Sequence, residues 1–153
     1  MLIKFDDGSP FAQGAAGYNT VPGYEMSEHI VLMVEIGAPA AMKEAAVDSS
    51  SPYLIFSSDV AKSIGLNLSK PDATGRARIQ GELIEGSIFV VPLTLLADPG
   101  EGVSLQQNVW AFVPHPDRKF DPDPLPPTLI GFKRCLDGFL FAVDPFKQTF
   151  YFG

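Results

Sequence analysis

An acidic residue at the end of an apolar run is the feature of this sequence best suited to chemistry. The stretch Ala45–Phe56 reads Ala-Ala-Val-Asp-Ser-Ser-Ser-Pro-Tyr-Leu-Ile-Phe, so Asp48 stands between small apolar residues and a polar turn. The hydroxyls of Ser49, Ser50 and Ser51 can hydrogen-bond nearby backbone groups and hold such a turn. Because burying a charge is costly, a carboxylate that a buried strand delivers to a turn indicates a functional site. An ordinary strand-to-turn transition with a surface aspartate explains the same pattern.

Serine, metal and thiol chemistry lack the partner residues that they need. A serine nucleophile requires a histidine base, and His29 and His115, the two histidines, each have a simple surface explanation. Two scattered histidines and one cysteine give no set of metal ligands, so neither a metal nor a cofactor is expected. Cys135 has either a lowered pKa beside Arg134 or a buried structural role, and the structural role is the commoner outcome. Lys133 and Arg134 are interpreted as a solvated helix face rather than an anion site.

Length and composition predict one β-rich domain in a chain of 153 residues. The 14 prolines and 14 glycines are spread along the chain and mark many turns, which favours an all-β fold. A net charge of −7 argues against nucleic acid or an anionic membrane as a partner. The first residues lack the apolar core of a signal peptide, and no apolar run is long enough to span a bilayer. We therefore expect a soluble, cytoplasmic protein.

The elements around Asp48 are expected to be strands joined by short turns. The segment Ser9–Tyr24 has no hydrophobic period and is read as a loop, which gives an N-terminal arm over residues 1–27 and a domain over 28–153. Pro114–Pro127 holds six prolines and is expected to be an extended surface loop. The expected strands and short helices are Ile30–Ile36, Met42–Val47, Tyr53–Phe56, a helix capped by Ser57 or Ser58, a hairpin within 74–96, a strand within Val103–Val113, Thr128–Gly131, helical turns in Phe132–Asp137, and a hairpin of Phe139–Val143 with Gln148–Phe152.

The order of these elements resembles the retropepsin-like aspartic proteases, the single-domain relatives of pepsin and the retroviral proteases. The matching residues are Ala46-Val47-Asp48-Ser49-Ser50-Ser51, then Ser57–Leu66, then Leu129-Ile130-Gly131, and finally Phe141–Asp144 with Thr149–Phe152. The resemblance covers roughly residues 30–152. It implies a closed, mostly antiparallel β barrel of the acid-protease type with one or two short helices, paired into a symmetric homodimer that cleaves a peptide or protein substrate.

The resemblance also implies a role for each matching residue. Asp48 is the aspartate that each subunit gives to a shared site, and Ser49 supplies the hydroxyl that braces the two active-site loops. Ser50 and Ser51 complete that loop. The segment Leu129, Ile130 and Gly131 packs beneath the aspartate loop, and the hairpin near Gln80, Gly81 and Glu82 is the flap that closes on the substrate.

Ser50 departs from the family pattern, which has glycine at the third position of the aspartate motif. Glycine lets the backbone approach its neighbours without a Cβ atom. Serine fits there if the local backbone has a negative φ, but it narrows the space, so the departure bears on catalysis more than on the fold.

Two functions from different classes follow from this pattern. Two aspartates about 3 Å apart share a proton, so one activates water while the other polarises a carbonyl. Asp137 and Asp144 look like ordinary turn acids, so the second carboxylate has to come from a second copy of the chain. The alternative is a catalytically inactive dimer that grips an extended peptide by β-addition. A purely structural β domain would leave Asp48 unexplained.

Overall fold

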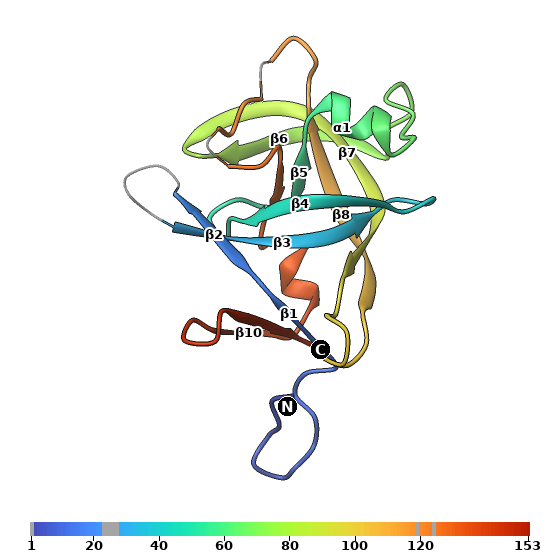
Figure 1. Cartoon of the computed structure of the whole chain (residues 1–153). Coiled ribbons are helices and arrows are strands. Elements are labelled where there is room, and N and C mark those ends of the chain that lie inside the picture. Colours follow the sequence, from blue (N-terminus) through green and yellow to red (C-terminus); the bar gives the residue numbers. More distant parts are fainter. Residues whose placement is uncertain (1, 23–27, 119, 124) are drawn as a thin grey trace.

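The computed structural model describes residues 2–22, 28–118, 120–123 and 125–153. Met1 and residues 23–27 of the expected arm, and residues 119 and 124 of the expected proline-rich loop, lie outside the described residues. The chain is mostly β and mostly antiparallel, as the sequence predicts (Figure 1). Its elements are β1 (Gly14–Gly17), β2 (Asn19–Pro22), β3 (Glu28–Ile36), β4 (Ala41–Val47), β5 (Leu54–Phe56), α1 (Ser58–Ser63), β6 (Ala73–Ile79), β7 (Glu82–Leu95), β8 (Leu105–Pro114), β9 (Thr128–Ile130), the 3₁₀ turn η2 (Leu136–Gly138), β10 (Phe141–Asp144) and β11 (Thr149–Phe152). None of the described helices is long and apolar enough to cross a membrane.

The larger sheet has the strand order β2-β3-β4-β9-β5-β8-β7-β6, and β3 also pairs with β7. The long strand β7 makes this extra pairing possible because it changes neighbours along its length. It pairs with β6 as far as Ile88 and with β3 from Leu93 onward, and Pro92, which has no amide hydrogen, lies in the gap between them. Among the described strands, only the β4–β9 and β5–β8 pairings are parallel, and the β4–β9 pairing lies at the end of β4.

The smaller sheet joins the two ends of the chain in the order β1-β11-β10. A loop covers the outer edge of β1, where the Ala15 amide donates to the Glu101 carbonyl at 2.9 Å. Among the described residues, β10 is hydrogen-bonded as a strand on one side only, to β11. The smaller sheet therefore has one covered edge and one open edge.

The expectation of a loop over Ser9–Tyr24 is wrong for β1 and β2. The strand β1 is Gly-Ala-Ala-Gly, which has no hydrophobic alternation, yet its first three residues are buried. A Cβ atom on Gly14 would lie 2.3 Å from the Val103 carbonyl oxygen and 2.6 Å from the Phe152 ring. Small residues are required because the strand is packed from both sides. A run of small residues has no hydrophobic alternation, so the sequence does not mark it as a strand. The division into an arm over 1–27 and a domain over 28–153 stays a prediction.

Two hydrophobic clusters pack against the larger sheet. The first is the main core, which includes Leu54, Phe56 and Ile130. The second cluster joins the underside of the β6–β7 hairpin to strands β3, β4, β5, β8 and β9. Its buried members are Val31, Ala46, Ile55, Ala77, Ile79, Ile84, Ile88, Phe112, Leu125 and Leu129. The hairpin is exposed on one face only, since Ala77, Ile79 and Ile84 are buried.

Candidate active site

Asp48 lies just beyond the end of β4, where the parallel pairing with β9 continues for one more residue. Its backbone amide donates to the Ile130 carbonyl oxygen at 2.9 Å. Side chains alternate along a strand, so Asp48 falls on the same face as Ala46, which belongs to the second cluster. The side chain is only 5% exposed. The interpretation of Asp48 as an ordinary surface acid is therefore wrong.

The neighbouring serines hold both oxygens of the Asp48 carboxylate. Ser50 donates to Oδ1 twice, through its hydroxyl at 2.5 Å and through its amide at 3.2 Å. The buried Ser51 hydroxyl donates to Oδ2 at 2.8 Å. The Ser51 amide closes the turn on the Asp48 carbonyl oxygen at 3.1 Å. The serine run thus forms a turn that surrounds the carboxylate with hydrogen-bond donors. The Ser50 and Ser51 hydroxyls donate to Asp48 and not to a histidine.

The backbone of the turn does not require glycine at position 50. Ser50 is not among the described non-glycine residues with positive φ, so the serine side chain is compatible with its backbone. The left-handed residue of this segment is Tyr53, with φ of 64°. Serine was expected to fit at position 50 if its φ is negative, and the structure meets this condition.

The segment Leu129, Ile130 and Gly131 lies against the Asp48 turn from the other side. Its strand β9 is inserted between β4 and β5. The Gly131 amide donates to the Tyr53 carbonyl oxygen at 2.7 Å, and a Cβ atom on Gly131 would lie 2.3 Å from that same oxygen. Glycine is needed here because the two backbones touch. The Phe132 amide donates to the Ser51 carbonyl oxygen at 2.8 Å, which ties the segment after β9 to the serine turn.

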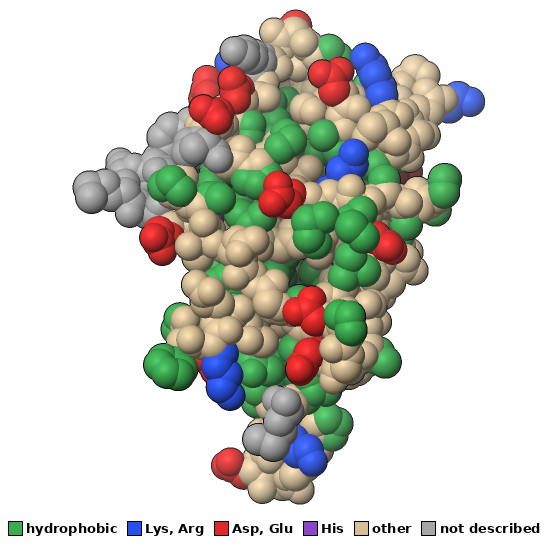
Figure 2. Space-filling model, viewed as in Figure 1, with side chains coloured by type: hydrophobic (Ala, Val, Ile, Leu, Met, Phe, Trp, Pro, Cys, Tyr) green, Lys and Arg blue, Asp and Glu red, His purple; other side chains and the backbone are tan. Residues whose placement is uncertain are grey.

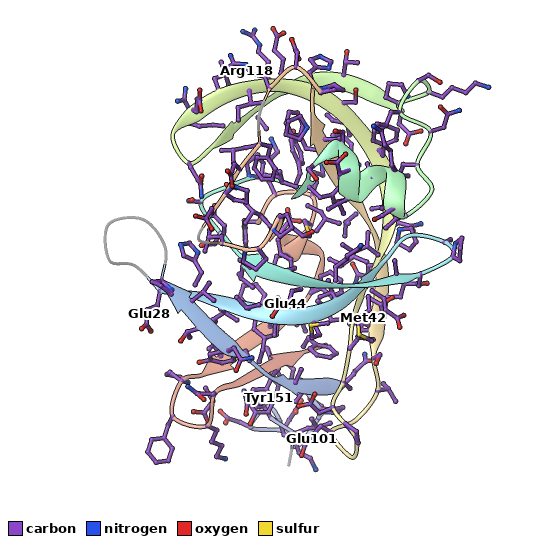
Figure 3. The ribbon with its side chains drawn as sticks, turned by 45° about the horizontal axis from the view of Figure 1, so that its top comes forward. Glu28, Met42, Glu44, Glu101, Arg118 and Tyr151 are labelled. Atoms are coloured by element: carbon purple, nitrogen blue, oxygen red, sulfur yellow. The ribbon has the colours of Figure 1, made fainter. Side chains whose placement is uncertain are left out.

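The hairpin expected near Gln80, Gly81 and Glu82 is present and turns at the first two of these residues. Gln80 has φ of 51° and Gly81 has φ of 82°, the paired left-handed conformation of a two-residue hairpin turn. All three residues are exposed at the tip. Arg118, on the loop that crosses the hairpin in Figure 3, lies 3.4 Å from the Glu82 carboxylate in a solvent-exposed ion pair. A role as a flap stays a prediction.

Two other candidate residues have clear surroundings. Ser49 is exposed, and its hydroxyl has no hydrogen-bond partner among the described residues. A ring nitrogen of His29 lies 3.1 Å from the Val47 carbonyl oxygen, one residue before Asp48. Within the described part of the chain, no three His, Cys, Asp or Glu side chains are grouped closely enough to hold a metal ion.

Cys135 is a buried thiol next to the segment that supports the turn. Burial, with a smaller contribution from the charge of Asp137, raises the pKa of the Cys135 thiol to about 12. The structural interpretation of this cysteine is confirmed, and the alternative of a lowered pKa beside Arg134 is wrong.

Two residues that the sequence did not single out, Tyr53 and Trp110, also stand beside the turn, together with Arg134, which the sequence placed on a solvated face. Tyr53 stacks on Trp110 with the ring centroids 6.0 Å apart, and the Arg134 guanidinium lies 4.6 Å from the centroid of the Trp110 ring. They come from three distant parts of the chain. The sequence signal was an aromatic residue two positions after the serine run.

Comparison with known proteins supports the fold and not the sequence family. No model of a known protein family matches this chain, and none of the curated protein sequences matches it. Among solved structures, the chain is similar to a retropepsin-like aspartic protease from Rickettsia conorii, with a TM-score of 0.50 and 13% sequence identity. The match covers 91% of this chain and 92% of the other. The chain therefore has the fold of a retropepsin-like aspartic protease.

Proposed function

We propose that the protein is an aspartic endopeptidase-like hydrolase that works as a homodimer. The observation that carries the proposal is the buried Asp48 carboxylate, held by serine hydroxyls at the end of β4 in a retropepsin-like fold. Asp48 has no cationic partner among the described residues, and the burial of such an acid costs stability, a cost that a functional role explains. We also take the ring of pairings β3-β4-β9-β5-β8-β7 as the closed barrel of the family.

The chemistry requires two copies of Asp48 at one site. Two carboxylates about 3 Å apart hold a single proton between them, because both cannot ionise cheaply. The ionised one takes a proton from a water molecule as that water attacks the scissile carbonyl carbon. The protonated one donates a hydrogen bond to the carbonyl oxygen, and a proton then passes to the leaving nitrogen as the C–N bond breaks. No covalent intermediate forms on the protein.

The open edge of β10 is the surface that we assign to the second copy. The segment from β9 to the end of the chain exposes apolar side chains, with Val143 at 39% on β10 itself and Leu140 at 53% just before it. An exposed strand edge with apolar neighbours favours pairing with another strand. In a two-fold dimer, β10 of one copy can pair with β10 of the other. The free Ser49 hydroxyl is then available to the partner's turn.

The hairpin of Gln80, Gly81 and Glu82 is proposed as the flap. Its underside packs in the second cluster, on the face to which Asp48 belongs. A substrate strand would lie between that underside and the two Asp48 turns, so the hairpin would have to lift away from the second cluster to admit it.

Cleavage of an unstructured polypeptide at mildly acidic pH is the direct test. Acid favours the singly protonated pair that the mechanism needs. The Asp48→Asn variant should remain a folded dimer and lose cleavage, because asparagine keeps the size of the side chain and loses its proton chemistry. Sedimentation at micromolar concentration should show a dimer. A strict monomer at high concentration would rule out the shared site.

A second candidate function is an inactive dimer that binds an extended peptide. The 2.5 Å hydrogen bond from the Ser50 hydroxyl to Oδ1 favours it, because that oxygen is already occupied on the side of the turn. If the native chain and the Ser50→Gly variant both fail to cleave a broad peptide library while they remain dimers, the hydrolase is ruled out. Peptide binding without turnover would then be the function to measure.

A further inference from the structure

An aromatic shelf with a cation on it lies beside the Asp48 turn. We define the shelf as Tyr53, Trp110 and Arg134. Tyr53 stacks on Trp110 with an interplanar angle of 28° and on Phe112 at 6.3 Å between centroids. Phe112 is completely buried, whereas Tyr53 and Trp110 are partly exposed. The shelf is thus anchored to the core through Phe112 and open to solvent above.

The backbone fixes the shelf relative to Asp48. The Tyr53 amide donates to the Lys133 carbonyl oxygen at 2.8 Å, and the Trp110 amide donates to the Arg134 carbonyl oxygen at 2.9 Å. Tyr53 and Trp110 pack against the second cluster, which occupies the face on which Asp48 lies. An extended peptide that passes Asp48 along this face therefore reaches the shelf within a few residues.

Backbone conformation sets the shelf apart from ordinary packing. Tyr53 has φ of 64° and Arg134 has φ of 59°, the left-handed region that is unfavourable for side chains of this size. Such conformations cost of order 1 kcal/mol or more each and concentrate at binding sites. Of the four described non-glycine residues with positive φ, Gln80 and Gln148 lie in the connections of hairpins, and the other two, Tyr53 and Arg134, belong to the shelf. The Arg134 side chain is exposed and the Tyr53 side chain is half-buried.

The charge on the shelf is unusual for this protein. The chain carries 18 acidic and 11 basic residues, and acidic side chains are scattered over the face drawn in Figure 2. Lys133 and Arg134 are adjacent, exposed and without an ion-pair partner among the described residues. A guanidinium stacked on an aromatic ring keeps its edge N–H groups free to bind a carboxylate. The shelf is therefore a local cationic site on an otherwise acidic molecule.

We propose that the shelf is a recognition subsite for a glutamate or aspartate side chain of an extended peptide. The carboxylate binds the edge of Arg134 with help from Lys133, and the apolar part of the peptide lies on Tyr53 and Trp110. The location of the peptide rests on the proposed function, but the subsite serves equally in a dimer that binds without cleaving. The acidic surface elsewhere repels such a peptide, so the cations also set its orientation.

Trp110 supplies the measurement because it is the only tryptophan in the chain. The Asp48→Asn variant is titrated with unstructured peptides that carry one glutamate at each position in turn, paired with the same peptides carrying glutamine. Binding is followed by Trp110 fluorescence and by calorimetry. At one position glutamate should bind roughly 1.5- to fivefold more tightly than glutamine, the range for an exposed ion pair. High salt should reduce this preference.

Arg134→Gln should remove the preference for glutamate, and Arg134→Lys should restore only part of it, since lysine keeps the charge but loses the planar fork. Lys70→Gln removes one positive charge from an exposed turn and is the matched control, with the preference unchanged. Equal affinity for both peptides at every position, a preference that survives Arg134→Gln, or no binding of either peptide would each overturn the proposal. Because binding is measured without turnover, loss of the protease claim leaves this result intact, and loss of the subsite leaves cleavage intact.

Discussion

Removing the Ser51 hydroxyl should destabilise the fold far more than removing the Ser50 hydroxyl. Both donate to the Asp48 carboxylate, Ser51 to Oδ2 at 2.8 Å and Ser50 to Oδ1 at 2.5 Å. Ser51 is 2% exposed and Asp48 is 5% exposed, so water has little access to replace the lost bond. A buried hydrogen bond to a charged group is worth about 1.5–3 kcal/mol. We expect Ser51→Ala to lower the free energy of unfolding by about 2 kcal/mol.

Ser50→Ala is the matched control because it also removes a serine hydroxyl that donates to Asp48, but from an exposed residue. Water replaces the donor there, and the Ser50 amide still donates to Oδ1 at 3.2 Å, so the loss should stay within about 0.5 kcal/mol. Urea unfolding of the two variants and the native chain measures both values, and 2 kcal/mol corresponds to a midpoint shift of about 1 M. Equal effects of the two substitutions, or a larger effect at Ser50, would refute the reasoning that burial decides the cost.

Three further measurements test other parts of the structure. Gly131→Ala should lower the free energy of unfolding by about 3 kcal/mol or more, since its Cβ atom would lie 2.3 Å from the Tyr53 carbonyl oxygen. In the control Gly75→Ala the nearest neighbour of the Cβ atom is 3.6 Å away, so the free energy of unfolding should change little, and thermal unfolding measures both variants. The free energy of unfolding should fall by about 1.4 kcal/mol per pH unit above pH 9, because the unfolded chain loses the Cys135 proton there while the folded chain keeps it up to about pH 12. Denaturant titrations measure this slope, and Cys135→Ala should remove it. Hydrogen exchange should be faster in residues 78–85 than in 30–36, because β6 is bonded on one edge and β3 is bonded to three strands; equal protection would contradict a gating hairpin.

The Asp48 turn could be predicted from the sequence because its signals are local. A run of small apolar residues that reaches an acid and then three hydroxyls describes a buried strand and the turn that ends it. The short helix was equally clear, since Ser57 caps α1 by accepting a hydrogen bond from the Val60 amide at 3.2 Å. In both places, neighbours within a few residues supply the hydrogen bonds that decide the structure.

The parts that the sequence did not predict depend on distant segments. The strand β1 is buried because Phe152 and Val103 pack against Gly14, and neither is near it in sequence. The shelf has the same origin, since Tyr53, Trp110 and Arg134 meet only after β5 pairs with β8 and the chain after β9 returns to the serine turn. A run such as Lys133-Arg134 reads as a solvated face until the fold places an aromatic ring beneath it.

Ser50 shows how a departure from a family pattern can be divided into separate physical causes. Its backbone is compatible with a side chain, so the fold gives no reason for glycine at this position. For the proposed hydrolase two effects of Ser50 remain to be separated, the space taken by the Cβ atom and the hydrogen bond from the hydroxyl to Oδ1. Ser50→Ala removes the hydroxyl and keeps the Cβ atom, whereas Ser50→Gly removes both. If the two variants raise cleavage equally, the hydroxyl restrains the carboxylate. If only Ser50→Gly raises it, the Cβ atom crowds the substrate or the partner's turn.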